Sequence, residues 1–383
     1  MYTKNAAKII LIVIVTITIV HFINTARNVG FTTTIATFTA DNSDQRDLTN
    51  LLRRESPDVF NHLPAQFLSE YKSFCWREEE DSKLLCLPSV YLAGMPKCGS
   101  TDLYRKLVWH PDLVQPTAGK ENHYWARKRL GKPSNHLSKG TTDPTQFSAF
   151  LNKLGPEKME GNTNLMLLDG TQSMLWDLRG WETRYSGQNQ PPYTNADLLN
   201  ELTPEAKILV ITRDPVQRLY SDYLYFNIGN DPNVTAYGFE AAVTKEMNRF
   251  HKCLETQDLK TCCYDSQNDP KLRLNLGIYI CFIRDWKKVF GGNILVVSLE
   301  DYSLYPFPTI SRIFSFLGVS QPTSQQLEDF LQNSIKENSR RKSAVKEGDM
   351  LPQTKKALQD FYGPYNRDLS RYLEDTRFLY NYQ

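Results

Sequence analysis

Short apolar runs alternate with amphipathic stretches along most of the chain. Four runs rich in Val, Ile and Leu predict β-strands over residues 89–93, 165–168, 207–212 and 294–298. Apolar positions at helical spacing predict helices over residues 101–109, 215–228, 239–254, 276–290, 308–317, 325–332 and 352–373. Apolar strands that alternate with helices indicate an α/β fold with a central parallel sheet flanked by helices.

The N-terminal part of the chain has a different pattern. Residues 9–23 read IILIVIVTITIVHFI and follow Lys4 and Lys8. The run is shorter than the span of about 20 residues that crosses a bilayer, but its flanks extend it. Lysines before the run predict a type II signal anchor with a cytosolic N-terminus. A cleaved signal peptide and a buried core helix are the alternatives.

The anchor interpretation divides the chain into three parts. Residues 1–26 would be the cytosolic tail and membrane span, and residues 27–74 a polar stem that lacks sustained apolar periodicity. Residues 75–383 would form a catalytic domain in the lumen of the secretory pathway. Asn233 begins the sequon Asn-Val-Thr, which is a glycosylation site if the domain is lumenal.

Composition narrows the class of protein. The chain has 383 residues, is 40% hydrophobic, and carries 45 Lys and Arg against 43 Asp and Glu, a net charge of +2. The length and apolar content support a large folded core. Near-neutrality argues against a protein that coats nucleic acid, so any anion site must come from local placement of charge.

The cysteines fit an oxidising compartment. Cys75 and Cys86 bracket a short polar segment, and so do Cys253 and Cys262, so both spacings suit local disulfides. Cys263 lies beside Cys262, and the spacing alone leaves open which of the two pairs with Cys253. The chain has seven cysteines, so at least one thiol stays unpaired. The spacings do not suggest a zinc site.

The turn after the first predicted strand has the composition of a phosphate loop. It reads Gly94-Met-Pro-Lys97-Cys98-Gly99-Ser100-Thr101 and opens a predicted helix. Gly99 allows close approach of the backbone, and the free N–H groups of the helix start favour an anion. The P-loop of ATPases has a lysine at the position of Ser100. In this chain the lysine of the loop is instead at position 97.

A second strand–helix unit carries candidate anion ligands. Residues 209–226 read LVITRDPVQRLYSDYLYF, with Pro215 at the helix start. Ser221 lies eight residues after Arg213, about two helical turns, so both side chains can face one ligand. A guanidinium group and a hydroxyl group suit a terminal phosphate.

These strings resemble a known family. PKCGSTDLY at residues 96–104 and the segment at 209–226 are similar to the 5′- and 3′-phosphate motifs of membrane-anchored carbohydrate sulfotransferases. Further similar segments cover about residues 75–373: KENHYW at 120–125, DGTQSMLWD at 169–177, EDY at 300–302 and NSRR at 338–341. The resemblance implies the sulfotransferase fold, a P-loop-like three-layer sandwich.

The resemblance also implies roles for individual residues. The sulfuryl donor would be 3′-phosphoadenosine-5′-phosphosulfate (PAPS), with no metal required. Glu121 would be the general base, Lys97 would stabilise the leaving phosphate, and His123 would orient the acceptor or the base. The donor-binding residues would be Lys97, Cys98, Gly99, Ser100, Thr101, Arg213, Ser221, Arg340 and Arg341.

The expected acceptor is a polyanionic glycan. A basic cluster after Glu121 (Lys120, Arg127, Lys128, Arg129 and Lys132) suits such a chain, and the first three are the predicted substrate-binding residues. The resemblance implies transfer to a glycosaminoglycan in the Golgi, with the 6-hydroxyl of N-acetylgalactosamine 4-sulfate in chondroitin or dermatan sulfate as the expected position. A heparan-type glycan or another alcohol is the alternative acceptor, and a homodimer is one alternative for the assembly.

Two other classes of function compete. A nucleotide kinase or ATPase is disfavoured by the displaced lysine and by the lack of a Walker-like second carboxylate strand. A catalytically silent glycan-binding protein on this fold would have lost its reactive residues. Lys97, Glu121, Arg213 and Ser221 are all present, which favours the enzyme.

Overall fold

The computed structural model describes residues 42–80, 82–130, 146–178, 180–227, 234–265, 272–333 and 349–380. The expected anchor, Asn233, Arg340 and Arg341 lie outside these residues. Within them, the helices are too short or too polar to cross a membrane. The chain divides into two compact units, Met1–Asn50 and Leu51–Gln383, and the site described below belongs to the second.

The predicted strands and helices are all present, together with elements that the sequence pattern did not predict. The strands of the described residues are β1 (Phe74–Arg77), β2 (Leu84–Leu87), β3 (Val90–Gly94), β4 (Leu113–Val114), β5 (Met166–Asp169), β6 (Lys207–Thr212) and β7 (Ile294–Ser298). The helices are α2 (Asn42–Glu55), α3 (Pro57–Asn61), α4 (Ser100–Val108), α5 (Phe147–Leu154), α6 (Trp181–Arg184), α7 (Asn195–Leu202), α8 (Pro215–Asn227), α9 (Ala236–Leu254), α10 (Leu259–Tyr264), α11 (Tyr279–Phe290), α12 (Leu299–Leu304), α13 (Pro306–Leu317), α14 (Ser324–Asn333) and α16 (Pro352–Leu373).

The central sheet has five parallel strands in the order β4-β5-β3-β6-β7. Strand β3 is buried along its whole length, and β6 is buried except for Lys207. Helices that cover both faces of a sheet bury its strands along their length, which explains why these strands are apolar throughout. The four predicted strands are confirmed, whereas β4 is only two residues long and has too little pattern to be recognised.

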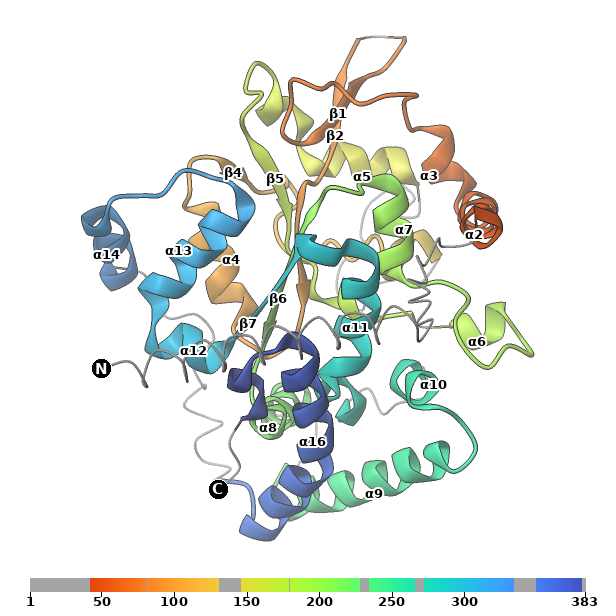
Figure 1. Cartoon of the computed structure of the whole chain (residues 1–383), viewed down its shortest axis with the longest axis vertical. Helices are drawn as coiled ribbons and strands as arrows, with labels where there is room; N and C mark the ends of the chain where they lie inside the picture. Colours follow the sequence, from red (N-terminus) through yellow and green to blue (C-terminus); the bar gives the residue numbers. More distant parts are fainter. Residues whose placement is uncertain are drawn as a thin grey trace, which may run out of the picture. The chain divides into compact units, whose positions relative to one another are not determined.

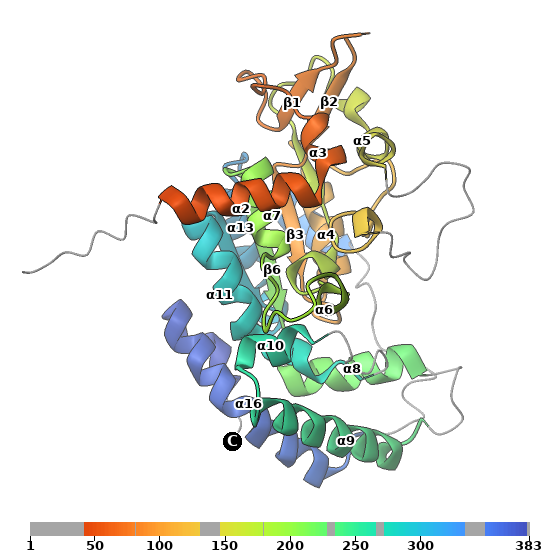
Figure 2. The ribbon, with the colours of Figure 1, turned by 90° about the vertical axis from the view of Figure 1, so that its right-hand side faces the viewer.

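Helices cover both faces of this sheet, which confirms the predicted three-layer α/β fold. Figure 1 shows α4 and α13 on one side of the strands and α7 and α11 on the other. The hairpin β1–β2 lies at one end of the sheet, and α8, α9 and α16 lie at the opposite end, in both views (Figures 1 and 2). Strand β6 ends at this second end of the sheet. Ligands of parallel sheets bind at the C-terminal ends of the strands.

Three features differ from the sequence expectations. Helices α2 and α3 occupy residues that we predicted as an irregular polar stem. Helices α5, α6, α7, α10 and α12 were not expected either, although a capping box of Thr194 and Asp197 closes the N-terminus of α7. The antiparallel hairpin of β1 and β2 was also not predicted. The stem itself stays a prediction.

The cysteine geometry selects one of the two open pairings. Cys75 and Cys86 face each other across the hairpin with their sulfur atoms 2.09 Å apart. The sulfur atoms of Cys253 and Cys262 are 1.99 Å apart, so Cys262 rather than Cys263 lies at disulfide distance from Cys253. Cys98, Cys263 and Cys281 are buried and lie outside these two pairs.

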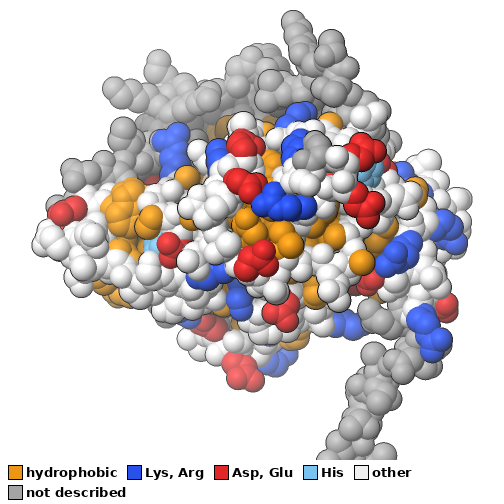
Figure 3. All heavy atoms as spheres, turned by 90° about the horizontal axis from the view of Figure 1, so that it is seen from above, with side chains coloured by type: hydrophobic (Ala, Val, Ile, Leu, Met, Phe, Trp, Pro, Cys, Tyr) orange, Lys and Arg blue, Asp and Glu red, His pale blue; other side chains and the backbone are white. Residues whose placement is uncertain are grey.

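Charge is mixed on the surface. On the face drawn in Figure 3, acidic and basic side chains are interspersed around hydrophobic ones. This arrangement fits the balance of 45 basic and 43 acidic residues. The charges that matter for an anionic ligand must therefore be gathered at particular loops.

Candidate active site

Three loops meet at the C-terminal edge of the sheet. The phosphate loop (residues 94–101) follows β3, the support loop (residues 169–178) includes the end of β5, and residues 213–215 follow β6. Because β3 lies between β5 and β6, its loop has the other two as neighbours. The base loop (residues 120–130) joins them through contacts with the support loop. The sheet thus brings together the segments that carry most of the predicted site residues.

The phosphate loop has the backbone of an anion site. Lys97 and Gly99 have positive φ angles of 63° and 80°, and α4 begins immediately afterwards at Ser100. The φ angle of Gly99 favours glycine, and a Cβ atom there would lie 2.7 Å from Cδ1 of Leu299 and displace the end of that side chain. The first N–H groups of α4 have no partner within the helix and favour a negative charge.

The two predicted phosphate motifs are in direct contact. Nη1 of Arg213 donates a hydrogen bond of 3.4 Å to the carbonyl oxygen of Lys97. The hydroxyl group of Tyr279 donates to the carbonyl oxygen of Arg213 at 2.7 Å, which holds the start of α8 against α11. Ser221 is partly exposed on α8, and Thr101 is partly exposed on α4. The tertiary structure therefore joins segments more than a hundred residues apart in one site.

Cys98 lies in the phosphate loop with its side chain turned into the protein interior. Its side chain is fully buried, with the sulfur atom 3.6 Å from the carbonyl oxygen of Pro96 and 3.8 Å from the hydroxyl oxygen of Tyr279. Burial raises the pKa of the Cys98 thiol to about 12, so the group stays protonated. Only the backbone of Cys98 can serve the phosphate loop, since its side chain is enclosed in the protein interior.

A buried network of charged side chains joins α8 to Arg273, and it was not predicted from the sequence. Asp222 is fully buried and accepts hydrogen bonds from Arg273, with Nε at 2.9 Å from Oδ2, and from Arg218 at 3.4 Å. Burial alone would raise the pKa of Asp222, but the two arginines and Lys97 lower it. Two guanidinium groups and one carboxylate leave a net positive charge beside the anion site. The spacing of Arg218 and Asp222, four apart on a helix, was the available signal.

Glu121 is the centre of the base loop. Its Oε1 accepts hydrogen bonds from Nζ of Lys120 at 2.6 Å and from Nε2 of Gln172 at 2.5 Å, while Nε2 of His123 lies 3.3 Å from Oε2. Glu121 and His123 both have positive φ angles, 67° and 55°. Such conformations cost energy in residues other than glycine and concentrate at functional sites.

The neighbours of Glu121 keep it ionised. Burial tends to raise the pKa of this carboxyl group, but the hydrogen bond from His123 and the charge of Lys120 outweigh burial and lower the pKa to about 2. Burial also lowers the pKa of Lys120, and the pair with Glu121 opposes that change. The carboxylate is therefore the form that meets a ligand at neutral pH.

The support loop holds the base loop in place, which the sequence did not reveal. The side chain of Asn122 donates to Oδ2 of the fully buried Asp169 at 2.8 Å and accepts from the N–H group of Tyr124 at 2.8 Å. Asp169 also accepts from the hydroxyl group of Thr171 at 2.6 Å. Nδ1 of His123 lies 2.8 Å from the Ser173 hydroxyl oxygen. Strand β5 thereby fixes the position of Glu121.

The residues of the basic cluster, predicted to bind a polyanionic acceptor, mostly have partners within the protein. Nε of Arg127 donates to the buried Oδ2 of Asp177 at 2.6 Å, and Lys120 pairs with Glu121. Nε of Arg129 donates to the carbonyl oxygen of Trp125 at 2.6 Å. Lys128 is partly buried, and Lys132 lies outside the described residues. Most of these cations therefore hold the base loop together.

An aromatic ring lies beside Lys97, the residue predicted to stabilise the leaving phosphate. Nζ of Lys97 lies 3.7 Å from the centre of the Tyr225 ring, and Tyr225 is 57% exposed. A cation over an aromatic face is held there electrostatically. In the described part of the chain, no group of three His, Cys, Asp or Glu residues is placed to hold a metal ion. The expectation that no metal is required stays a prediction.

Comparisons with known proteins agree with the predicted family. Residues 87–363 match the family model described as "Sulfotransferase domain". The chain is 31% identical to carbohydrate sulfotransferase 15 of Rattus norvegicus over 388 residues, covering 86% of this chain and 68% of that protein. It is 30% identical to carbohydrate sulfotransferase 15 of Homo sapiens over 390 residues, with the same coverage.

A solved structure has the same fold. The crystal structure of a sulfotransferase from Alicyclobacillus acidocaldarius superposes with a TM-score of 0.50 and 18% sequence identity. The likeness covers 76% of this chain and 96% of that one. At this level of identity the likeness concerns the arrangement of the sheet and helices.

Proposed function

This chain belongs to the sulfotransferase domain family, and on that premise we propose that it transfers a sulfuryl group from PAPS to a hydroxyl group of a glycan. The observation that carries the proposal is the contact of the two phosphate motifs, with Arg213 bonded to the backbone of Lys97. A donor with a phosphate at each end needs two anion sites at a fixed separation, and these motifs supply them.

The chemistry divides among three groups of residues. The first N–H groups of α4, after Gly99, would bind the 5′-phosphate, while Arg213 and Ser221 would bind the 3′-phosphate. The acceptor oxygen forms a bond to sulfur as the bond from sulfur to the bridging phosphate oxygen breaks. Lys97 would stabilise the charge that develops on that bridging oxygen. The products are a sulfate ester and 3′-phosphoadenosine-5′-phosphate.

Glu121 would take the proton of the acceptor hydroxyl. Its Oε1 already accepts two hydrogen bonds, so the proton would pass to Oε2, which faces His123 at 3.3 Å. A pKa near 2 makes Glu121 a weak base in this arrangement. Proton transfer is therefore expected to accompany the breaking of the sulfur–oxygen bond, when the hydroxyl proton becomes acidic.

The acceptor and the compartment belong to the same proposal. The relatives' name, carbohydrate sulfotransferase 15, supports a glycan, and the sequence resemblance points to the 6-hydroxyl of N-acetylgalactosamine 4-sulfate. The apolar run at residues 9–23 and the two cysteine pairs support a Golgi type II membrane protein with its catalytic domain and Asn233 in the lumen. These assignments extend the donor chemistry and are tested separately from it.

One experiment tests the proposal. The full chain is incubated with PAPS labelled in its sulfuryl group and with desulfated chondroitin, 4-sulfated chondroitin, dermatan sulfate or heparan sulfate. We expect label in the 4-sulfated chondroitin, and at the 6-position on disaccharide analysis. Transfer to heparan sulfate alone would replace the acceptor and leave the donor chemistry intact. Transfer of phosphate from labelled ATP, with none from PAPS, would overturn the proposal.

A further inference from the structure

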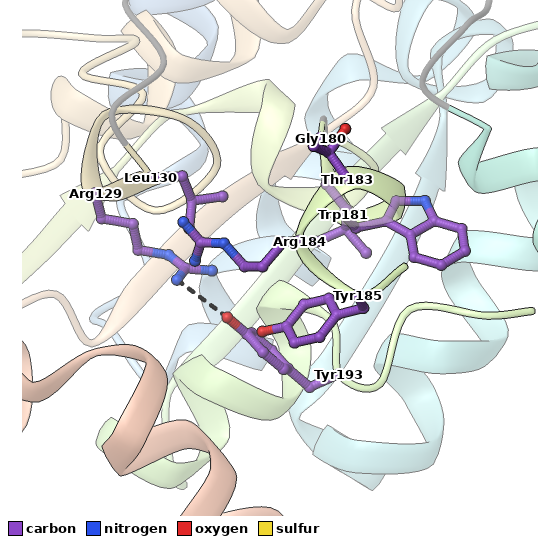
Figure 4. Close-up of a pocket in the computed structure, with 9 residues that line it drawn as sticks. Arg129, Leu130, Gly180, Trp181, Thr183, Arg184, Tyr185 and Tyr193 are labelled. Carbon is purple, nitrogen blue, oxygen red and sulfur yellow. Dashed lines mark hydrogen bonds between the residues drawn. The ribbon is translucent and has the colours of Figure 1, made fainter. Parts of the chain in front are cut away.

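A cavity lies beyond the base loop. It has a volume of about 290 Å³ and is lined by Arg129, Leu130, Leu178, Gly180, Trp181, Thr183, Arg184, Tyr185 and Tyr193 (Figure 4). Its walls come from the end of the base loop, from the last residue of the support loop and the residues after it, and from Tyr193 before α7. The roles proposed above for the reaction with PAPS do not involve these residues.

The cavity lies where the base loop and the support loop continue beyond the residues proposed for the reaction. The base loop and the support loop touch at Glu121 with Gln172, at His123 with Ser173, and at Arg127 with Asp177. The next residues of both segments then line the cavity. From Glu121 to Arg129 an extended chain could cover at most about 28 Å. Turns such as the bond from Arg127 N–H to His123 C=O shorten that separation.

Two guanidinium groups point toward one another across the cavity (Figure 4). Arg129 is held by the Trp125 carbonyl and by weaker contacts of Nη1 with the Ser56 and Tyr193 hydroxyl groups, at 3.4 and 3.5 Å. The Arg184 side chain is 38% exposed. Arg184 forms an ion pair with Glu55 at 3.7 Å, and two guanidinium groups against this one carboxylate leave a net positive charge at the cavity.

Aromatic rings form the rest of the cavity. Tyr185 and Tyr193 pack edge to face, with ring centres 6.2 Å apart, and Trp181 is nearly buried beside them. The Tyr185 hydroxyl oxygen lies close to Tyr193 and Glu55, yet within the described residues it makes no hydrogen bond of acceptable geometry. Apolar ring faces with a few convergent polar groups are typical of a ligand site.

We propose that this cavity is a remote subsite that binds an anionic sugar of the acceptor chain, away from the sugar that is sulfated. Guanidinium groups bind sulfate and carboxylate groups in a fork geometry, and tyrosine rings can pack against the apolar face of a sugar. The inference rests on the proposed function, because it presumes a polymeric acceptor that runs from Glu121 to Arg184.

The experiment compares acceptor lengths in the wild type and in Arg184→Gln. Arg184 is suitable because its exposed side chain has little structural role, whereas Arg129 supports the base loop. We expect KM for a 4-sulfated chondroitin dodecasaccharide to rise about 3- to 10-fold, the effect of one partly screened charged contact. KM for a tetrasaccharide and kcat for both acceptors should stay unchanged. Arg371→Gln, another exposed arginine paired with an acid, is the matched control.

The outcomes separate this inference from the proposed function. An equal rise in KM for both lengths, or no rise for either, would overturn the remote subsite while sulfuryl transfer stands. If the wild type transfers nothing from PAPS, calorimetry with the same dodecasaccharide still tests the cavity. Weaker binding by Arg184→Gln than by Arg371→Gln supports the subsite, and equal binding refutes it.

Two buried cysteines outside the cavity lie close together. The sulfur atoms of Cys263 and Cys281 lie 2.7 Å apart, and both residues are buried, at 1% and 8% exposure. The bond length of a disulfide is about 2.05 Å, so the pair lies only roughly 0.7 Å beyond it. Two non-bonded sulfur atoms do not approach so closely. Cys263 lies in the last turn of α10, and Cys281 lies in the first turn of α11.

We infer that Cys263 and Cys281 form a third disulfide as the protein folds, which leaves Cys98 as the unpaired thiol. The two thiols would pass two electrons and two protons to the oxidised disulfide of a thiol–disulfide oxidoreductase, which is reduced to its dithiol. The bond would tie α10 to the start of α11, where Tyr279 holds Arg213. It rests on the proposed lumenal location, which supplies the oxidant.

Counting thiols in the denatured full chain, without reductant, tests this bond. We expect one reactive thiol in the wild type, none in Cys98→Ser and two in Cys281→Ser, because that last change releases Cys263. Three thiols in the wild type would refute the third disulfide and keep the two pairs already at bonding distance. Seven thiols would instead refute the oxidising compartment, and with it the oxidant that this bond requires.

Discussion

The phosphate loop presents backbone N–H groups at the start of a helix, whereas the base loop presents side chains whose charges are already paired within the protein. Gly99 with its φ of 80° and the start of α4 at Ser100 define the first region. Glu121 with Lys120, and Arg127 with Asp177, define the second. The backbone site can bind any well-placed phosphate, while the side-chain site depends on each partner.

This difference explains how a nearly neutral chain can bind anionic ligands. Cations that are paired inside the base loop mainly fix its conformation and add little to a positive surface. The positive charge proposed for ligands comes from the start of α4, from Lys97 and Arg213, and from the arginines of the cavity, with the buried excess of Arg218 and Arg273 over Asp222 behind them. We therefore expect mutations in the two regions to affect different kinetic constants.

The largest effect is expected from Glu121→Gln. The variant keeps the size of the side chain but cannot accept a proton, so kcat should fall by about 10²–10⁴-fold. Affinity for 3′-phosphoadenosine-5′-phosphate, measured by calorimetry, should stay unchanged because the phosphate loop is intact. The exposed Glu205 supplies the control Glu205→Gln. A variant that keeps more than about a tenth of the wild-type rate would exclude Glu121 as the base.

Arg213→Ala tests the phosphate side of the comparison. Loss of a charged hydrogen bond is typically worth about 1.5–3 kcal/mol, so Kd for 3′-phosphoadenosine-5′-phosphate should rise about 10- to 100-fold. Calorimetry measures this change, with Arg371→Ala as the control on an exposed helix. Unchanged affinity would remove Arg213 from the 3′-phosphate site.

A smaller effect is expected from Ser173→Ala, which removes the hydroxyl group 2.8 Å from Nδ1 of His123. Ser173 is a positioning residue, and a neutral hydrogen bond contributes about 0.5–1.5 kcal/mol. We expect kcat to fall about 2- to 10-fold with KM for PAPS unchanged. Ser315→Ala, on the exposed side of α13, is the control. A change in KM for PAPS without a change in kcat would contradict this role.

The smallest expected effect is on the pH dependence of the free energy of unfolding. The pKa of Glu121 in the folded protein, about 2, lies below its ordinary value of 4.5. The ionised carboxylate therefore stabilises the fold above pH 4.5, and this contribution is lost as the pH falls toward 2. The free energy of unfolding of the wild type, relative to Glu121→Gln, should decrease between pH 5 and pH 3 in urea titrations. A constant difference would mean that the pairing with Lys120 and His123 is weak.

The sequence predicted the parts of the protein that depend on local pattern. The runs at residues 207–212 and 294–298 are the strands β6 and β7 with the same bounds, because a strand buried on both faces must be apolar throughout. The helix predicted over residues 352–373 is α16 with the same bounds. Gly99 was identified from its place between a strand and a helix, and its positive φ gives the reason.

Only the tertiary structure decided which charges are available and which are paired. Arg127 belongs to a basic cluster in the sequence, but Asp177 comes to it from the end of another segment fifty residues away. Asp169, Asn122 and Gln172 support Glu121 through side-chain contacts that follow from the pairing of β4 with β5. A sequence sets the intrinsic charge and conformational preference of each residue, but the partner that neutralises a charge depends on contacts between distant segments.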